Sequence, residues 1–199
     1  MAEITAELVK QLRDKTSAGM MDCKKALAEA KGDMEAAQKW LREKGLASAA
    51  KRSGRTTSQG TIESYIHMNG NIGVMVELNC ETDFVAKTHE FRALARDIAM
   101  HIAASSPQYL KREDVPKEII DKEVEIIKAQ AKSEGKPEAV LQKIADGRIS
   151  KFYSEICLEE QPFVRDTDKT VSDFVKETAS KFGEHVQIRR FVRMQLGEE

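Results

Sequence analysis

The most constraining feature of the sequence is a pair of alternating segments joined by Asn69-Gly70. In residues 61–67 the side chains alternate, with Ile62, Ser64 and Ile66 on one face, and residues 72–79 carry apolar side chains at every second position, as half-buried strands do. Asn and Gly both tolerate positive φ, so this dipeptide is a strong signal for a hairpin. Residues 186–196 alternate again and predict a third strand, antiparallel to the hairpin. We therefore expect a three-stranded antiparallel sheet.

Helices are expected to cover this sheet, which makes residues 61–199 an α+β domain. Residues 84–105 carry apolar side chains at helical spacing and predict one long helix. Thr170 and Gly183 are the expected cap and terminator of another helix, which places Phe174 in its apolar stripe.

Residues 116–160 are highly charged and predict a helical excursion from the domain. Pro116 and Gly135 bound its first expected helix, and a second runs from Pro137 to about Ala145. A third is expected around residues 149–156.

Residues 1–46 predict a module of three short helices. Each helix is about ten residues long, which is too short to be stable alone. The expected caps are Thr5, Asp22 and Asp33, and the expected stops are Gly32 and Gly45. The expected core consists of Leu8, Leu12, Leu27, Trp40 and Leu41. The module resembles ubiquitin-associated domains, a generic docking fold whose shape does not identify its partner.

Residues 47–60 are small, polar and basic, and we interpret them as a linker whose alanines could extend the preceding helix. The formal charge changes sign across this segment, from +4 over residues 1–55 to −5 over residues 56–199. A net charge of −1 for the whole chain is not typical of a uniformly basic nucleic-acid binder.

The cysteines and the hydropathy indicate a cytoplasmic protein without a membrane span. Cys23, Cys80 and Cys157 are odd in number and far apart, as expected in a reducing compartment. No apolar run exceeds three residues. The four histidines show no metal-ligand spacing, so we expect neither a metal nor another cofactor.

Residues 77–87 (ELNCETDFVAK) carry the most information about function. On physical grounds alone they are best explained as a strand-to-helix turn capped by Thr82 or Asp83. Phe84 would then stand on a surface-facing corner, where an aromatic side chain can act as a wedge in a partner.

The same segment resembles one of the two signature segments of the elongation factor Ts family, and residues 12–27 resemble the other. The likeness continues through residues 32–45 to the C-terminal FGEHVQIRRF and covers essentially the whole chain. The family consists of cytosolic factors that exchange the nucleotide of the translational GTPase elongation factor Tu. Membership would make the chain a non-enzymatic translation factor.

The resemblance implies three sets of partner contacts. The N-terminal module would dock on the GTPase, the TDFV segment would disturb the GTPase near its magnesium and phosphate site, and the turn before the last strand would make a third contact. In this order the matching residues are Arg13, Met20 and Met21; Thr82, Asp83, Phe84 and Val85; and Phe182 and Gly183.

The resemblance also implies an oligomeric state. The longest members carry two core subdomains, whereas this sequence has room for one sheet and matches the short bacterial members. A homodimer that binds two partner molecules, a two-to-two complex, is therefore expected.

Other interpretations stay open at this point. A Met pair such as Met20-Met21 lies in a core more often than on a contact surface. The basic N-terminal segment with Lys51, Arg52 and Arg55 could instead make the chain an RNA-binding module. Catalysis has the least support, because nine residues across a strand–helix junction separate Cys80 from His89.

Overall fold

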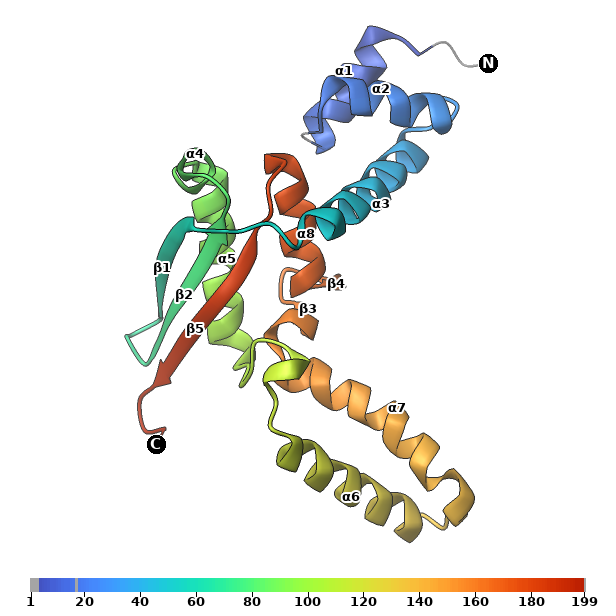
Figure 1. Cartoon of the computed structure of the whole chain (residues 1–199), viewed down its shortest axis with the longest axis vertical. Helices are drawn as coiled ribbons and strands as arrows, with labels where there is room; N and C mark the ends of the chain where they lie inside the picture. Colours follow the sequence, from blue (N-terminus) through green and yellow to red (C-terminus); the bar gives the residue numbers. More distant parts are fainter. Residues whose placement is uncertain (1–3, 17, 199) are drawn as a thin grey trace. The chain divides into compact units, whose positions relative to one another are not determined.

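The computed structural model describes residues 4–16 and 18–198, and it divides into two compact units (Figure 1). One unit combines the described residues up to Gly60 with Asn79–Thr88 and Val175–Gln187. The other combines Thr61–Leu78 and His89–Phe174 with the residues from Ile188 onward. These units do not show whether residues 1–46 and 61–199 fold independently, so the predicted boundaries of the module and the domain stay a prediction.

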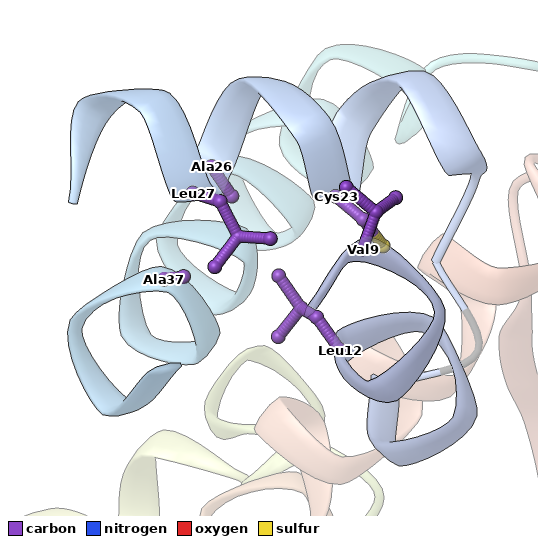
Figure 2. Close-up of a cluster of buried hydrophobic side chains, with 6 residues drawn as sticks. All are labelled: Val9, Leu12, Cys23, Ala26, Leu27 and Ala37. Atoms are coloured by element: carbon purple, nitrogen blue, oxygen red, sulfur yellow. The ribbon is translucent and has the colours of Figure 1, made fainter. Parts of the chain in front are cut away.

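The N-terminal module consists of the helices α1 (Ala6–Thr16), α2 (Met20–Glu29) and α3 (Met34–Arg52). Two of the three expected caps are confirmed: the Thr5 hydroxyl accepts a hydrogen bond from the Leu8 amide, and the Asp33 carboxylate accepts one from the Ala36 amide. Figure 2 shows the shared core, in which Leu12 and Leu27 point toward each other. Its buried members are Val9, Leu12, Cys23, Ala26, Leu27 and Ala37, with Leu8, Trp40 and Leu41 partly buried around them.

Two boundary predictions for this module were wrong. Gly19, not Asp22, is the N-cap of α2, and Asp22 lies inside the first turn, where it pairs with Lys44. Gly45 does not end α3, which continues for seven more residues to Arg52. If residue 45 had a Cβ atom, it would lie 3.1 Å from the Ser180 hydroxyl. The glycine therefore lets α3 pack closely against Ser180 without ending the helix.

The predicted three-stranded sheet is confirmed, with the order β1-β2-β5. Its strands are β1 (Gln59–His67), β2 (Ile72–Cys80) and β5 (Gln187–Gln195). Val74, Val76 and Leu78 of the central strand are buried. The β1–β2 connection is a four-residue loop in which Met68 and Gly70, rather than Asn69 and Gly70, have positive φ.

The expected long helix over residues 84–105 is two helices, α4 (Asp83–Ala86) and α5 (His89–Ser105). Thr88 ends the first one, because its amide and its hydroxyl both donate to the Val85 carbonyl. Helix α5 lies against one face of the sheet (Figure 1), where Arg96 approaches Glu63 of β1 to 4.0 Å. Its inner side chains include Phe91, Leu94, Ile98 and Ile102, all buried.

The charged excursion is a helical hairpin of α6 (Lys117–Ser133) and α7 (Glu138–Ile156), which lie side by side in Figure 1. The two predicted segments after Pro137 form one continuous helix, so the expected break near Ala145 was wrong. The buried residues of the two helices are Ile127 and Ala131 in α6 and Leu141, Ala145 and Ile156 in α7. The short 3-10 turns η1 (Arg112–Asp114) and η2 (Leu158–Glu160) flank it.

The segment after the excursion contains a small hairpin that the sequence pattern did not predict, β3 (Pro162–Phe163) with β4 (Asp166–Thr170). Helix α8 (Val171–Phe182) follows, with the predicted cap, since the Thr170 hydroxyl accepts a hydrogen bond from the Asp173 amide. The predicted terminator is confirmed as well, because Gly183 follows α8 with a φ of +71°. Over the described residues, no helix has the length and apolar content needed to cross a membrane.

Candidate partner-binding site

Helix α4 forms a sharp corner at the end of β2 and holds Phe84 away from the protein. Thr82 is the N-cap, and its hydroxyl accepts a hydrogen bond of 3.4 Å from the Val85 amide. Phe84 is 81% exposed, whereas Ala86 on the same helix is buried. An aromatic side chain that folding leaves this exposed is free to enter a partner. Residues 80–86 are called the Phe84 corner below.

Asp83 is oriented by its own helix. Its carboxylate accepts a hydrogen bond of 2.6 Å from the Lys87 ammonium, one turn further along. This hydrogen bond lowers the pKa of Asp83, so the carboxylate beside Phe84 is charged near neutral pH.

The Phe84 corner is bound to the turn after α8 by the carboxylate of Glu184. One of its oxygens, Oε2, accepts hydrogen bonds from the backbone amides of Glu81, at 3.1 Å, and Thr82, at 3.0 Å. The other oxygen, Oε1, accepts a hydrogen bond from the hydroxyl of Thr82. A single side chain therefore satisfies two backbone donors and orients the N-cap hydroxyl.

A second carboxylate makes the opposite connection. Glu81 Oε1 accepts the His185 amide at 2.6 Å, and the guanidinium of Arg55 lies 3.3 Å from the same oxygen. The His185 amide is the main cause that lowers the pKa of Glu81, and the charge of Arg55 adds to it. The ring of His185 contacts the Arg55 carbonyl through Nδ1, at 2.9 Å.

Cys80 stabilises the corner and is not suited to nucleophilic chemistry. Its buried thiol donates to the Thr82 carbonyl at 3.2 Å. Burial raises the pKa of the Cys80 thiol to about 11, which leaves it protonated near neutral pH. Within residues 4–16 and 18–198 there is also no group of three or more His, Cys, Asp or Glu side chains arranged to bind a metal ion.

The turn after α8 contains two of the predicted contact residues. Gly183 is exposed and Phe182 is partly buried. Because Gly183 precedes Glu184 directly, the hydrogen bonds of Glu184 bring this predicted segment next to Thr82. Two of the three predicted contact sets therefore meet locally, although they lie about 100 residues apart in the sequence.

The remaining predicted contact residues lie on the surface of the N-terminal module. Met20 and Met21 occupy the first turn of α2 and are 53% and 75% exposed. Arg13 is exposed near the end of α1. The Met pair thus lies outside the module's buried core, which favours the interpretation as a contact surface over the core alternative.

The sequence patterns did not single out Glu81, Glu184 or His185. Their interactions connect positions 103 and 104 residues apart, and no local periodicity encodes such a pairing. The only local signal is the position of Glu184 directly after a helix-terminating glycine, which exposes polar groups at a turn.

Comparison with known proteins identifies the family. The family model described as elongation factor TS matches residues 2–198. The chain is 60% identical to elongation factor Ts of Desulforamulus reducens over 198 residues, which covers all of this chain and 91% of that relative. It is also 60% identical to elongation factor Ts of Carboxydothermus hydrogenoformans, over 98% of this chain and 90% of that relative.

A match over nearly the whole chain, at this level of identity, agrees with the two signature segments and with the fold. The chain belongs to the elongation factor Ts family and is a translation elongation factor.

Proposed function

We propose that this chain is a guanine-nucleotide exchange factor that promotes GDP release from elongation factor Tu. The observation that carries the proposal is Phe84, an aromatic side chain that is 81% exposed on a capped and hydrogen-bonded corner. The corner would insert Phe84 near the magnesium and phosphate site of the GTPase, with Asp83 charged beside it. The exposed Met20, Met21 and Arg13 would dock the N-terminal module on the same GTPase.

The mechanism is thermodynamic linkage and requires no bond chemistry. The factor and magnesium-bound GDP stabilise different conformations of the GTPase, so each weakens the binding of the other by the same factor. A coupling free energy of about 3 kcal/mol corresponds to a roughly 150-fold change in affinity. Burying an aromatic side chain supplies a free energy of this order. The chain would therefore act without being an enzyme.

The direct test is release of fluorescent GDP from elongation factor Tu, measured with and without this protein. We expect release to accelerate with protein concentration and to reach a plateau. No acceleration at micromolar concentration would contradict the proposal.

The docking role is tested by the double variant Met20→Ala/Met21→Ala. It should raise the concentration that gives half-maximal release and leave the plateau rate unchanged, because these side chains serve binding rather than displacement. Val164→Ala, which truncates another exposed apolar side chain, is the matched control and should change neither quantity.

RNA binding is the alternative for the basic N-terminal segment. The structure gives Arg55 a local role, since its side chain pairs with Glu81 and its carbonyl contacts His185. A salt-dependent RNA affinity that disappears when Lys51, Arg52 and Arg55 are neutralised would favour the alternative.

We also propose that the chain forms a homodimer through the uncovered face of its sheet. Ile62, Ile66, Met75, Val192 and Met194 are between 54% and 70% exposed. A Cβ atom at Gly73 of β2 would lie 3.3 Å from the side chain of Ile66 of β1, and Glu77 of β2 pairs with Arg190 of β5. These contacts show which residues of the three strands share a face. Because side chains alternate along each strand, all five apolar side chains lie on that face. Met68 and Leu196 are exposed at the ends of these strands.

The area of this face suits a second copy. Full burial of a large apolar side chain contributes about 1.5–3 kcal/mol, which at about 25 cal/mol per Å² corresponds to roughly 60–120 Å² of apolar area. Seven such side chains that are between 54% and 81% exposed therefore offer on the order of 400 Å². A homodimer interface of about 800 Å² per partner that is about 65% apolar needs a similar apolar area.

Sedimentation velocity tests the dimer. We expect twice the 22.3 kDa mass of one chain for the wild type, and a monomer for Val192→Asp. Val140→Asp, an exposed control on α7, should stay dimeric. A monomeric wild type at 100 μM would contradict the dimer and the two-to-two complex with it.

A further inference from the structure

The Phe84 corner has too little regular structure to hold its own geometry. Helix α4 has four residues, so it forms a single turn, and an isolated turn is not stable in water. Thr82 contributes one capping hydrogen bond, and Ala86 is the buried residue of this helix. The direction of Phe84 must therefore be fixed by groups that connect the corner with another segment.

Those groups are two carboxylates that connect the corner with the turn after α8 in both directions. Glu184 of the turn binds the backbone of the corner, at the amides of Glu81 and Thr82. Glu81 of the corner binds the backbone of the turn, at the amide of His185. Each segment thus supplies an acceptor to the other segment's amides, and together these contacts fix the backbone from Glu81 to the start of α4.

The N-cap hydroxyl shows how this arrangement reaches Phe84. Thr82 Oγ1 has one proton, which it donates to Glu184, and this leaves a lone pair to accept the Val85 amide. Glu184 therefore orients the hydroxyl for capping. Capping in turn fixes the turn of helix that presents Phe84.

We propose that Glu184 and Glu81 are positioning residues for nucleotide exchange, which act by holding Thr82 and helix α4 so that Phe84 points outward. This inference rests on the exchange function proposed above. Gly183 acquires a matching local role: with φ at +71° it makes the turn that brings Glu184 to the corner.

Glu184→Gln is the sharpest variant. Glutamine keeps the size of the side chain but has one acceptor oxygen, whereas Glu184 uses both of its oxygens. We expect the plateau rate of GDP release to fall about tenfold while the half-saturating concentration changes less than about twofold. A loss of folded protein would raise the half-saturating concentration instead. Glu125→Gln, an exposed control on α6, should match the wild type in both quantities.

A double-mutant cycle tests whether Glu184 acts through Phe84. If it does, Glu184→Gln should have no further effect in a Phe84→Ala background, because the side chain to be positioned is absent. Effects that multiply in the double variant would overturn the inference.

Amide hydrogen exchange of the isolated protein gives a readout that does not depend on nucleotide release. Protection of the Glu81 and Thr82 amides should decrease in Glu184→Gln and stay unchanged in Glu125→Gln. Unchanged protection, or an unchanged plateau rate with an active wild type, would overturn the positioning role alone. An inactive wild type would overturn the exchange function itself, and the positioning role with it.

Discussion

The tripeptide Asp-Phe-Val occurs twice in this chain, and the structure places the two copies in opposite environments. Phe84 of the first copy is 81% exposed. Phe174 of the second copy is partly buried and stacks on Phe163, with ring centroids 4.2 Å apart and planes tilted by 11°. Phe174 thus packs against a neighbouring ring, as its place in the apolar stripe predicted, although it is only partly buried.

The difference arises from helix length and from the distance to the cap. Thr82 directly precedes the first copy, and α4 ends one residue after it, at Ala86. Two residues separate Thr170 from the second copy, and α8 continues to Phe182. A long amphipathic helix buries its apolar stripe, whereas a single turn can expose one large side chain. Identical residues therefore serve packing in one place and, as we propose, recognition in the other.

The largest change in unfolding free energy should come from Phe174→Ala. Removing a packed aromatic ring costs about 3–5 kcal/mol, and the partial exposure of Phe174 places it near the lower value, at about 3 kcal/mol of unfolding free energy. Urea denaturation measures this loss. The plateau rate of GDP release should stay within about twofold of the wild type. A loss below about 1 kcal/mol would show that the stacking on Phe163 contributes little.

Phe84→Ala should reverse this pattern. Truncating an aromatic residue at the centre of an interface costs about 2 kcal/mol, which corresponds to roughly 30-fold slower GDP release at saturation. The unfolding free energy should change by less than about 0.5 kcal/mol, because the ring is exposed. Normal release by this variant would remove the functional contrast between the two copies.

The two capping threonines allow a finer contrast. Thr82→Ala and Thr170→Ala should each lower the unfolding free energy by about 1 kcal/mol, the usual cost of a lost N-cap. Only Thr82→Ala should also lower the plateau rate of GDP release, because only α4 presents an exposed aromatic residue. Equal plateau rates for the two variants would indicate that the geometry of α4 does not matter.

The smallest effect concerns pH. The pKa of Glu81 is lowered from 4.5 in the folded protein, chiefly by the His185 amide. The stabilisation that accompanies this shift is fully present above pH 4.5 and is lost as the pH falls through the lower, folded-state value. A carboxyl-carbon NMR titration should place the midpoint of Glu81 below 4.5.

Arg55→Ala is the matched variant for this titration. It should raise the midpoint only in part, since the hydrogen bond from the His185 amide still lowers the pKa of Glu81. A wild-type midpoint at or above 4.5 would contradict the hydrogen bond between Glu81 and His185.

Much of the fold could be predicted because its signals are local. The alternation around Asn69-Gly70 and in residues 186–196 predicted all three strands of the main sheet, and Thr5, Asp33 and Thr170 cap the helices they precede. The errors occurred where tertiary packing outweighed propensity. Gly45 lies inside α3, where the absence of a side chain lets the helix pack closely against Ser180. The single helix predicted over residues 84–105 is interrupted because Thr88 ends α4.

The sequence by itself determined most of the helices, the three strands of the main sheet, the family, and the segment in which to look for the site, because periodicity, caps and signature motifs act over a few neighbouring residues. Only the tertiary structure decided which carboxylates hold the exposed Asp-Phe-Val copy and which ring packs on the other copy. The contacts of Glu184 with Thr82 and of Phe163 with Phe174 depend on how distant segments pack. The same tripeptide therefore acquires its role from what lies next to it in space.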